Sequence, residues 1–205
     1  MTAPLPAAEP VVAWGYASRA LEGDCSGDVH VVAPFDRGAL VAVFDGLGHG
    51  EEAAQAATAG AAVLQADPSA PVGELVLRCH DALRGTRGAV LTVVSIDAVR
   101  GELEWCGVGN VEGMLVRGQR GLPSEAVPTR GGVVGYRLPP LKVSSVPITP
   151  GDILLLASDG LRSGFWAALE RDAEPQQMAD ALFARYAKTT DDALVLAVRY
   201  LGAPP

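Results

Sequence analysis

The hydrophobic pattern along the chain combines short apolar runs with longer stretches of helical spacing. Short runs bounded by Gly, Pro or Asp indicate strands, whereas apolar positions that recur every three or four residues indicate helices. We therefore predict strands at residues 11–17, 29–33, 39–44, 89–97, 102–108, 111–117, 143–146, 152–158 and 193–200. We predict helices at residues 51–66, 71–83, 164–169 and 175–187.

The order of these elements indicates the fold class. In the middle of the chain, tight turns at residues 99–101 and 109–110 separate three consecutive strands, which favours antiparallel pairing between neighbours. Two helices precede this β-rich middle and two more come before the last strand. This order predicts an α+β fold, a four-layer α-β-β-α sandwich in which two mixed, mostly antiparallel sheets are flanked by helices.

The first two central strands are predicted to form a hairpin. Residues 34–38 contain Pro and Gly and make a turn between the apolar runs 29–33 and 39–44. Such a hairpin brings Asp28, just before the first run, near Asp45, just after the second.

Composition narrows the class of protein. The chain has 205 residues, 49% of them hydrophobic, so we expect one domain over residues 1–205 with residues 1–10 loosely held. A net charge of -8 argues against nucleic-acid binding. No apolar run reaches the roughly 18 residues of a membrane span, and a signal peptide is not evident, so we expect a cytoplasmic protein without a membrane partner. Three widely spaced cysteines indicate neither a disulfide framework nor a zinc site.

The strongest local signal is the glycine-rich segment 41–50. Its apolar run ends at Asp45, and glycines follow at positions 46, 48 and 50 before the predicted helix. Glycine permits close approach of other atoms to the backbone, so the Asp45 carboxylate and a main-chain carbonyl can face one hard cation such as Mg²⁺ or Mn²⁺. The alternative interpretation is a strand-to-helix connection in which Asp45 only caps the helix.

Two further acids occupy similar positions. Asp159 ends an apolar strand and Asp191 precedes one, so both can project from a sheet rim into the same cleft as Asp45. Carboxylates a few Å apart repel strongly, and divalent cations offset that repulsion. Asp192 stands beside Asp191, and strand alternation sends their side chains to opposite faces. The pattern alone does not choose between them.

Three motifs occur in this order: Phe44-Asp45-Gly46-Leu47-Gly48-His49-Gly50, Ala157-Ser158-Asp159-Gly160-Leu161 and Asp191-Asp192-Ala193-Leu194-Val195-Leu196. Together they resemble the metal-dependent serine/threonine phosphatases of the PPM (type 2C) family over nearly the whole chain. The resemblance is closest to the small bacterial branch that contains the sporulation phosphatase SpoIIE and the feedback phosphatase of the stressosome.

The resemblance implies a site with two Mn²⁺ or Mg²⁺ ions. Asp45 would bridge the ions, the Gly46 carbonyl would bind one, and Asp159 with Asp191 would bind the other. Asp28 matches the branch's early acid, which acts directly or through water. Such enzymes have no protein nucleophile, because a metal-activated water attacks the phosphorus.

Other candidate residues have alternative interpretations. His49 could donate a proton to the leaving oxygen, or it could cap the helix or pack in the loop. Arg19 could bind phosphate, although its spacing to Asp28 departs from that of larger relatives, or it could be a solvated charge. Tyr136 and Arg137, in an irregular glycine-rich stretch at residues 131–138, could anchor a folded partner, or the stretch could be a flexible connection.

We therefore predict a protein phosphoserine/phosphothreonine phosphatase that acts on STAS-domain proteins of a bacterial stressosome or sigma-factor pathway. One alternative is a non-catalytic docking module with the same fold, and another is a phosphoesterase for small molecules. Residues 107–110 depart from the Gly-Asp-Ser-Arg turn of longer family members, which makes a third metal site doubtful.

Overall fold

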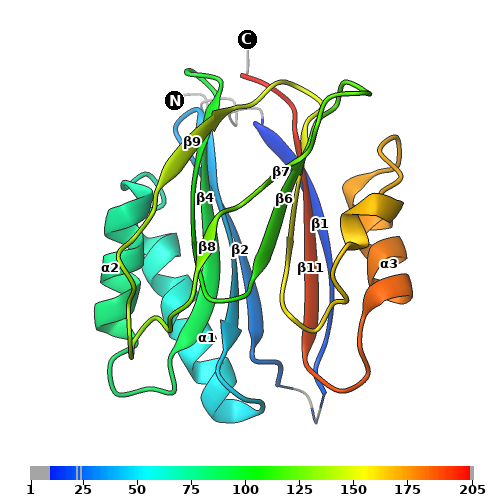
Figure 1. The fold of residues 1–205 in the computed structure, drawn as a ribbon. Helices are drawn as coiled ribbons and strands as arrows, with labels where there is room; N and C mark the ends of the chain where they lie inside the picture. Colours follow the sequence, from blue (N-terminus) through cyan, green and yellow to red (C-terminus); the bar gives the residue numbers. More distant parts are fainter. Residues whose placement is uncertain (1–9, 22, 24, 204–205) are drawn as a thin grey trace, which may run out of the picture.

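Two β-sheets pack face to face in the computed structural model, which describes residues 10–21, 23 and 25–203, and helices cover both outer faces (Figure 1). The first sheet has the strand order β1-β11-β10-β6-β7, and each neighbouring pair in it is antiparallel. Its strands are β1 (Val12–Arg19), β6 (Glu112–Val116), β7 (Glu125–Ala126), β10 (Ile153–Ala157) and β11 (Ala193–Tyr200).

The second sheet has the order β2-β3-β4-β5-β8, and a further short strand, β9, also pairs with β5. Its strands are β2 (Asp28–Phe35), β3 (Gly38–Gly46), β4 (Ala89–Asp97), β5 (Glu102–Val108), β8 (Thr129–Arg130) and β9 (Ser144–Pro147). Strands β5 and β8 pair in parallel, and among the described strands this pair makes the sheet mixed. The predicted four-layer sandwich is confirmed.

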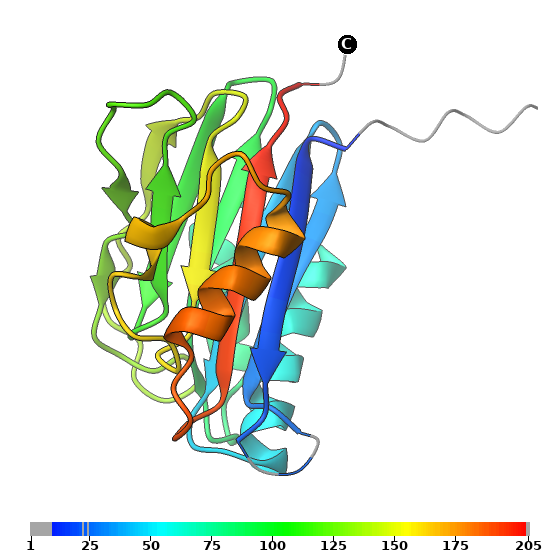
Figure 2. The same ribbon diagram turned by 90° about the vertical axis from the view of Figure 1, so that its right-hand side faces the viewer.

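Helices α1 (Glu51–Ala66) and α2 (Val72–Ala82) lie on the second sheet, and α3 (Pro175–Tyr186) with the 3₁₀ turn η1 (Phe165–Ala168) lies on the first (Figure 2). Glycines allow two of these contacts. A Cβ on Gly60 of α1 would lie 2.5 Å from the Phe44 ring, and one on Gly15 of β1 would lie 2.4 Å from the backbone of Gln176. The helix predicted at residues 164–169 is present only as the 3₁₀ turn η1.

The core between the sheets comes from alternate residues of their inner faces. Val41 and Val43 of β3 belong to the same buried hydrophobic cluster as Leu154 and Leu156 of β10, and all four side chains are at most 1% exposed. Burial of one such side chain stabilises the fold by about 2 kcal/mol. Because β3 is covered by α1 on its other face, its residues from Gly38 to Phe44 are buried on both faces, which explains its continuous apolar pattern.

One predicted pairing is wrong. The strands at residues 102–108 and 111–117 were expected to pair with each other, but β5 pairs with β4 and β6 pairs with β10 in the opposite sheet. Gly109, with φ of 94°, lets the chain leave one sheet and enter the other within three residues, where a Cβ would collide with Val90. The short connection between β5 and β6 is therefore a crossing between the two sheets. Asn110 lies in this connection.

Candidate metal centre

The predicted hairpin between β2 and β3 places two acids directly opposite each other. Asp28 is the cross-strand partner of Asp45 at the end of this ladder, so both carboxyl groups project from the same face. Burial raises the pKa of Asp28 to about 7, although a hydrogen bond from Ser158 opposes the shift. Burial and the nearby charge of Asp28 raise the pKa of Asp45 to about 8. A positive charge nearby would therefore stabilise the ionised form of both carboxyl groups.

The end of β3 is packed tightly against α1. A Cβ on Gly46 would lie 2.2 Å from the main-chain oxygen of Ala53, so only glycine lets the helix approach this closely. The Gly46 amide donates to the Gly27 carbonyl at 2.9 Å. Helix α1 has Gly50 as its N-cap, so Asp45, at the end of β3, is not the cap residue.

The opposite sheet supplies Asp159, which follows β10. Its carboxylate accepts a hydrogen bond of 2.8 Å from the Asn110 side-chain amide. The ammonium of Lys188 donates to the main-chain oxygen of Asp159. A Cβ on Gly160 would lie 1.9 Å from the main-chain oxygen of Asp192, so this glycine lets the segment after β10 meet the start of β11. That contact brings the second and third motifs together.

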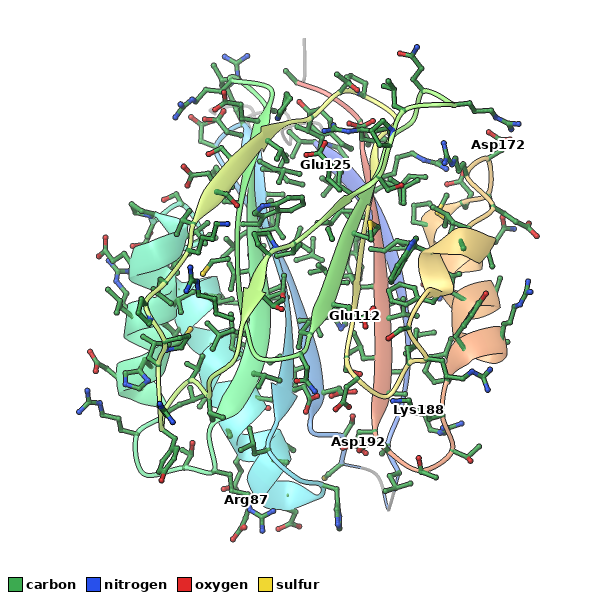
Figure 3. All side chains as sticks on the ribbon, in the orientation of Figure 1. Arg87, Glu112, Glu125, Asp172, Lys188 and Asp192 are labelled. Carbon is green, nitrogen blue, oxygen red and sulfur yellow. The ribbon has the colours of Figure 1, made fainter. Side chains whose placement is uncertain are left out.

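Asp191 and Asp192 have different roles. Asp192 is 4% exposed, and its two carboxylate oxygens accept the backbone amides of Leu21 and Gly27, each at 2.6 Å. It therefore ties both ends of the segment before β2 to the start of β11 (Figure 3). Asp191 instead lines the cleft, as expected from the alternation of side chains along a strand.

These groups surround a cleft of about 490 Å³ at one end of the sandwich, where the two sheets open. Its lining side chains belong to both sheets and to the connecting loops: Leu21, Asp45, Leu47, Gly48, His49, Val90, Asn110, Val133, Asp159, Thr190 and Asp191. The predicted convergence of Asp45, Asp159 and Asp191 on one cleft is thus seen in the structure.

The donor set suits a hard cation. It consists of carboxylate oxygens from the paired ends of β2 and β3 and from the loops that carry Asp159 and Asp191. Mg²⁺ and Mn²⁺ prefer oxygen ligands. Within the described residues, no three Asp, Glu, His or Cys side chains lie close enough together to hold a metal ion by themselves. An ion held here would keep part of its water shell, as Mg²⁺ usually does in proteins.

The remaining sequence candidates lie at different distances from the cleft. His49 lines it. The Arg19 guanidinium donates to the main-chain oxygen of Lys188 and stands over the Phe183 ring at 5.8 Å, so it is engaged beside the cleft. Tyr136 is 84% exposed and Arg137 is also exposed, on a tight turn whose neighbour Val133 lines the cleft.

Sequence reasoning missed two supporting residues. Asn110 was noted only as a departure from a family motif, and Ser158 only as a neighbour of Asp159. The β6–β10 register pairs Glu112 with Ala157, and continuing it by two residues places Asn110 opposite Asp159. The position of Asn110 opposite Asp159 can be inferred only when β6 is known to pair with β10. The sequence predicted instead that residues 111–117 pair with residues 102–108.

Comparison with known proteins agrees with this geometry. The family model of stage II sporulation protein E (SpoIIE) matches residues 36–201, which include all three motifs. The chain belongs to the SpoIIE family. This confirms the resemblance to the bacterial branch of PP2C-type phosphatases.

Individual relatives point the same way. The phosphoserine phosphatase RsbX of Bacillus subtilis (strain 168) is 30% identical over 89 residues, a stretch that spans 43% of this chain and 45% of RsbX. A chain from a structural study of the bacterial stressosome superposes with a TM-score of 0.84 at 28% identity, covering 92% of this chain and 99% of the other. The crystal structure of RsbX in complex with magnesium gives a TM-score of 0.83 at 21% identity, covering 92% and 95%. SpoIIE-family membership and this fold place the chain among PP2C-type serine phosphatases.

Among the described residues, no helix is long and apolar enough to cross a membrane.

Proposed function

We propose that this chain is a metal-dependent protein phosphoserine/phosphothreonine phosphatase. The observation that carries the proposal is the cleft between the sheets, where Asp45 from one sheet faces Asp159 and Asp191 from the other. The buried Asp28 beside Asp45 adds a fourth carboxyl group. A docking module without turnover has no physical reason to keep so many carboxylates together, because their repulsion destabilises the fold.

In this proposal Asp45, Asp159, Asp191 and the Gly46 carbonyl hold two Mn²⁺ or Mg²⁺ ions. When bound, these ions supply positive charge to phosphoryl oxygens and acidify water, so the protein itself needs no nucleophile. Asp45 would be a ligand of both ions. Asp28, with one oxygen held by Ser158 at 2.6 Å, acts directly or through water.

Two further residues are assigned supporting roles. His49 lies in the cleft lining, where an imidazole can donate a proton to the leaving seryl or threonyl oxygen. The Arg19 guanidinium uses Nη2 to bind the Lys188 carbonyl at the cleft's edge, and its other N–H groups could bind phosphate.

The proposed substrates are phosphorylated STAS-domain proteins of a stressosome or sigma-factor pathway in the cytoplasm. The similarity to the phosphoserine phosphatase RsbX and to a stressosome chain supports this choice. We assign the contact with a folded partner to Tyr136 and Arg137, because both are exposed on a turn that adjoins Val133 of the cleft lining. The Gly135 amide donates to Nδ1 of His80 at 2.9 Å, and Val134 pairs with Ala89. A small-molecule phosphoesterase is the competing function, since metal chemistry is indifferent to what lies behind the phosphate.

The test is phosphate release from a purified panel of phosphorylated STAS-domain proteins in Mn²⁺, compared with release from a small aryl phosphate. We expect release from a phosphoprotein to stop with EDTA and to return with Mn²⁺ or Mg²⁺ but poorly with Zn²⁺, because the ligands are all oxygens. Asp45→Asn should keep less than about a tenth of the activity. The matched control is Asp36→Asn, which changes an exposed acid in the turn at the other end of the same hairpin.

Each outcome separates the alternatives. Turnover of the aryl phosphate alone would indicate a small-molecule phosphoesterase. Turnover of neither substrate in Mn²⁺ would indicate a docking module. Activity that survived exhaustive chelation would contradict the metal mechanism and direct attention to Cys25, which is exposed.

A further inference from the structure

Two facing pairs of polar side chains lie at or beside the cleft, one from each sheet. At the end of the β2–β3 ladder, Asp28 stands opposite Asp45. In the other sheet the β6–β10 register, extended by two residues beyond Glu112 and Ala157, sets Asn110 opposite Asp159. The first pair has two carboxyl groups, whereas the second has an amide and a carboxylate that are hydrogen-bonded at 2.8 Å.

The backbone on both sides of Asn110 is held in place. The Gly109 amide donates to the Arg130 carbonyl at 2.8 Å. The hydroxyl of Thr92, which is fully buried, donates to the Val111 carbonyl at 2.8 Å. The φ of 94° at Gly109 completes the crossing between sheets. Asn110 is thus exposed at its side chain and stands between two residues whose main-chain groups are hydrogen-bonded.

The amide does two things that a carboxylate could not. Its N–H group donates to one oxygen of Asp159 and so fixes the rotation of that carboxylate. Because the amide is neutral, it adds no negative charge beside the carboxyl groups of Asp28, Asp45 and Asp159. Asp159 itself lines the cleft, and its second carboxylate oxygen takes no part in this bond.

We propose that Asn110 is a positioning residue that orients the Asp159 carboxylate for a divalent cation and keeps the charge of the cluster low. This rests on the proposed metal-binding role of Asp159. Partners that orient ligating groups typically change metal affinity by 10- to 100-fold when they are removed.

The chain offers a direct probe of this contact, because Asn110 is its one asparagine. Protein labelled with ¹⁵N-asparagine gives the signal of one side-chain amide in an NMR spectrum, seen as two proton peaks at one nitrogen frequency. We expect Mg²⁺, added to chelator-treated protein, to shift this signal with the same midpoint as calorimetric Mg²⁺ binding.

Two substitutions separate orientation from charge. Asn110→Ala removes the donor, and we expect it to weaken Mg²⁺ binding about 10-fold in calorimetry. Asn110→Asp keeps the size but sets a carboxylate against Asp159, so we expect a lower melting temperature without metal and a larger rise on adding Mg²⁺ than in the original protein. The matched control is Ser163→Ala, which removes an exposed hydrogen bond to Glu112, two residues from Asn110, and should leave both quantities unchanged.

Three results would overturn the inference. They are an Asn110 amide signal that does not shift with Mg²⁺, an unchanged Mg²⁺ affinity in Asn110→Ala, and a rise in melting temperature with Mg²⁺ that is the same in Asn110→Asp as in the original protein. The inference and the proposed function fail separately. If the protein binds Mg²⁺ but hydrolyses no phosphoprotein, the function is wrong while the affinity data still decide the role of Asn110. If phosphoprotein is hydrolysed and Asn110→Ala binds Mg²⁺ normally, only the inference is wrong.

Discussion

The hydroxyl of Ser158 donates a hydrogen bond of 2.6 Å to the Asp28 carboxylate, and this bond joins the two sheets. Ser158 directly follows β10 in the first sheet, whereas Asp28 begins β2 in the second. The same hydroxyl accepts the Leu194 amide at 3.0 Å, so it also fixes the start of β11. Ser158 is 2% exposed and Asp28 is 6% exposed, so this bond is buried. One side chain thus aligns three of the strands that carry the site.

Ser158→Ala should lower the free energy of unfolding by about 1–3 kcal/mol, because it leaves the Leu194 amide and one oxygen of Asp28 buried without this partner. Urea denaturation of the metal-free protein measures the effect. The control Ser145→Ala removes an exposed hydroxyl from β9 and should change stability by less than about 0.5 kcal/mol. Equal effects in the two variants would show that the bond between the sheets contributes little.

Asp191→Asn and Asp192→Asn should separate the two adjacent acids. Asp192→Asn loses one of two backbone hydrogen bonds, since an amide nitrogen cannot accept, and should destabilise the metal-free protein by about 1–3 kcal/mol. Asp191→Asn should fold with nearly unchanged stability and lose Mg²⁺ affinity. Urea denaturation and calorimetry of the pair give the answer, and the reverse pattern would assign the ligand role to Asp192.

The metal-free protein should lose stability as the pH rises from about 4 to about 8. In the unfolded chain both aspartates have a pKa near 3.8, whereas in the folded protein burial raises the pKa of Asp28 to about 7 and that of Asp45 to about 8. The folded state therefore binds more protons in this window, and its free energy of unfolding falls with pH. Denaturant titrations at several pH values should show a shallower dependence in Asp45→Asn, which should also be the more stable protein at pH 8. A slope unchanged by Asp45→Asn would contradict the shift.

Replacing Tyr136 and Arg137 together by Ala should raise KM for a folded phosphoprotein several-fold and leave hydrolysis of a small aryl phosphate nearly unchanged, because only binding outside the metal centre is lost. Steady-state kinetics on both substrates measures this. Arg120→Ala, which removes an exposed cation elsewhere, is the control and should have no effect. Equal losses on both substrates would show that the turn shapes the metal centre, and no loss would place docking elsewhere.

The sequence alone determined the elements and the principal acids. The helix at residues 51–66 and the strands at 89–97, 102–108 and 193–200 have the same bounds as α1, β4, β5 and β11, because their apolar periodicity and flanking Gly, Pro and Asp residues are local properties. The opposition of Asp28 and Asp45 was also predictable, since a short turn sets the register of a hairpin.

Only the tertiary structure decided which groups support these acids. Asn110 meets Asp159, which lies 49 residues away along the chain, and Ser158 meets Asp28, which lies 130 residues away. The positive φ at Gly109 helps to send β6 to the opposite sheet. Asp192 was distinguished from Asp191 by the amides of Leu21 and Gly27, about 170 residues earlier. Strand periodicity says which face a side chain takes, but only the pairing of distant strands says what that face meets.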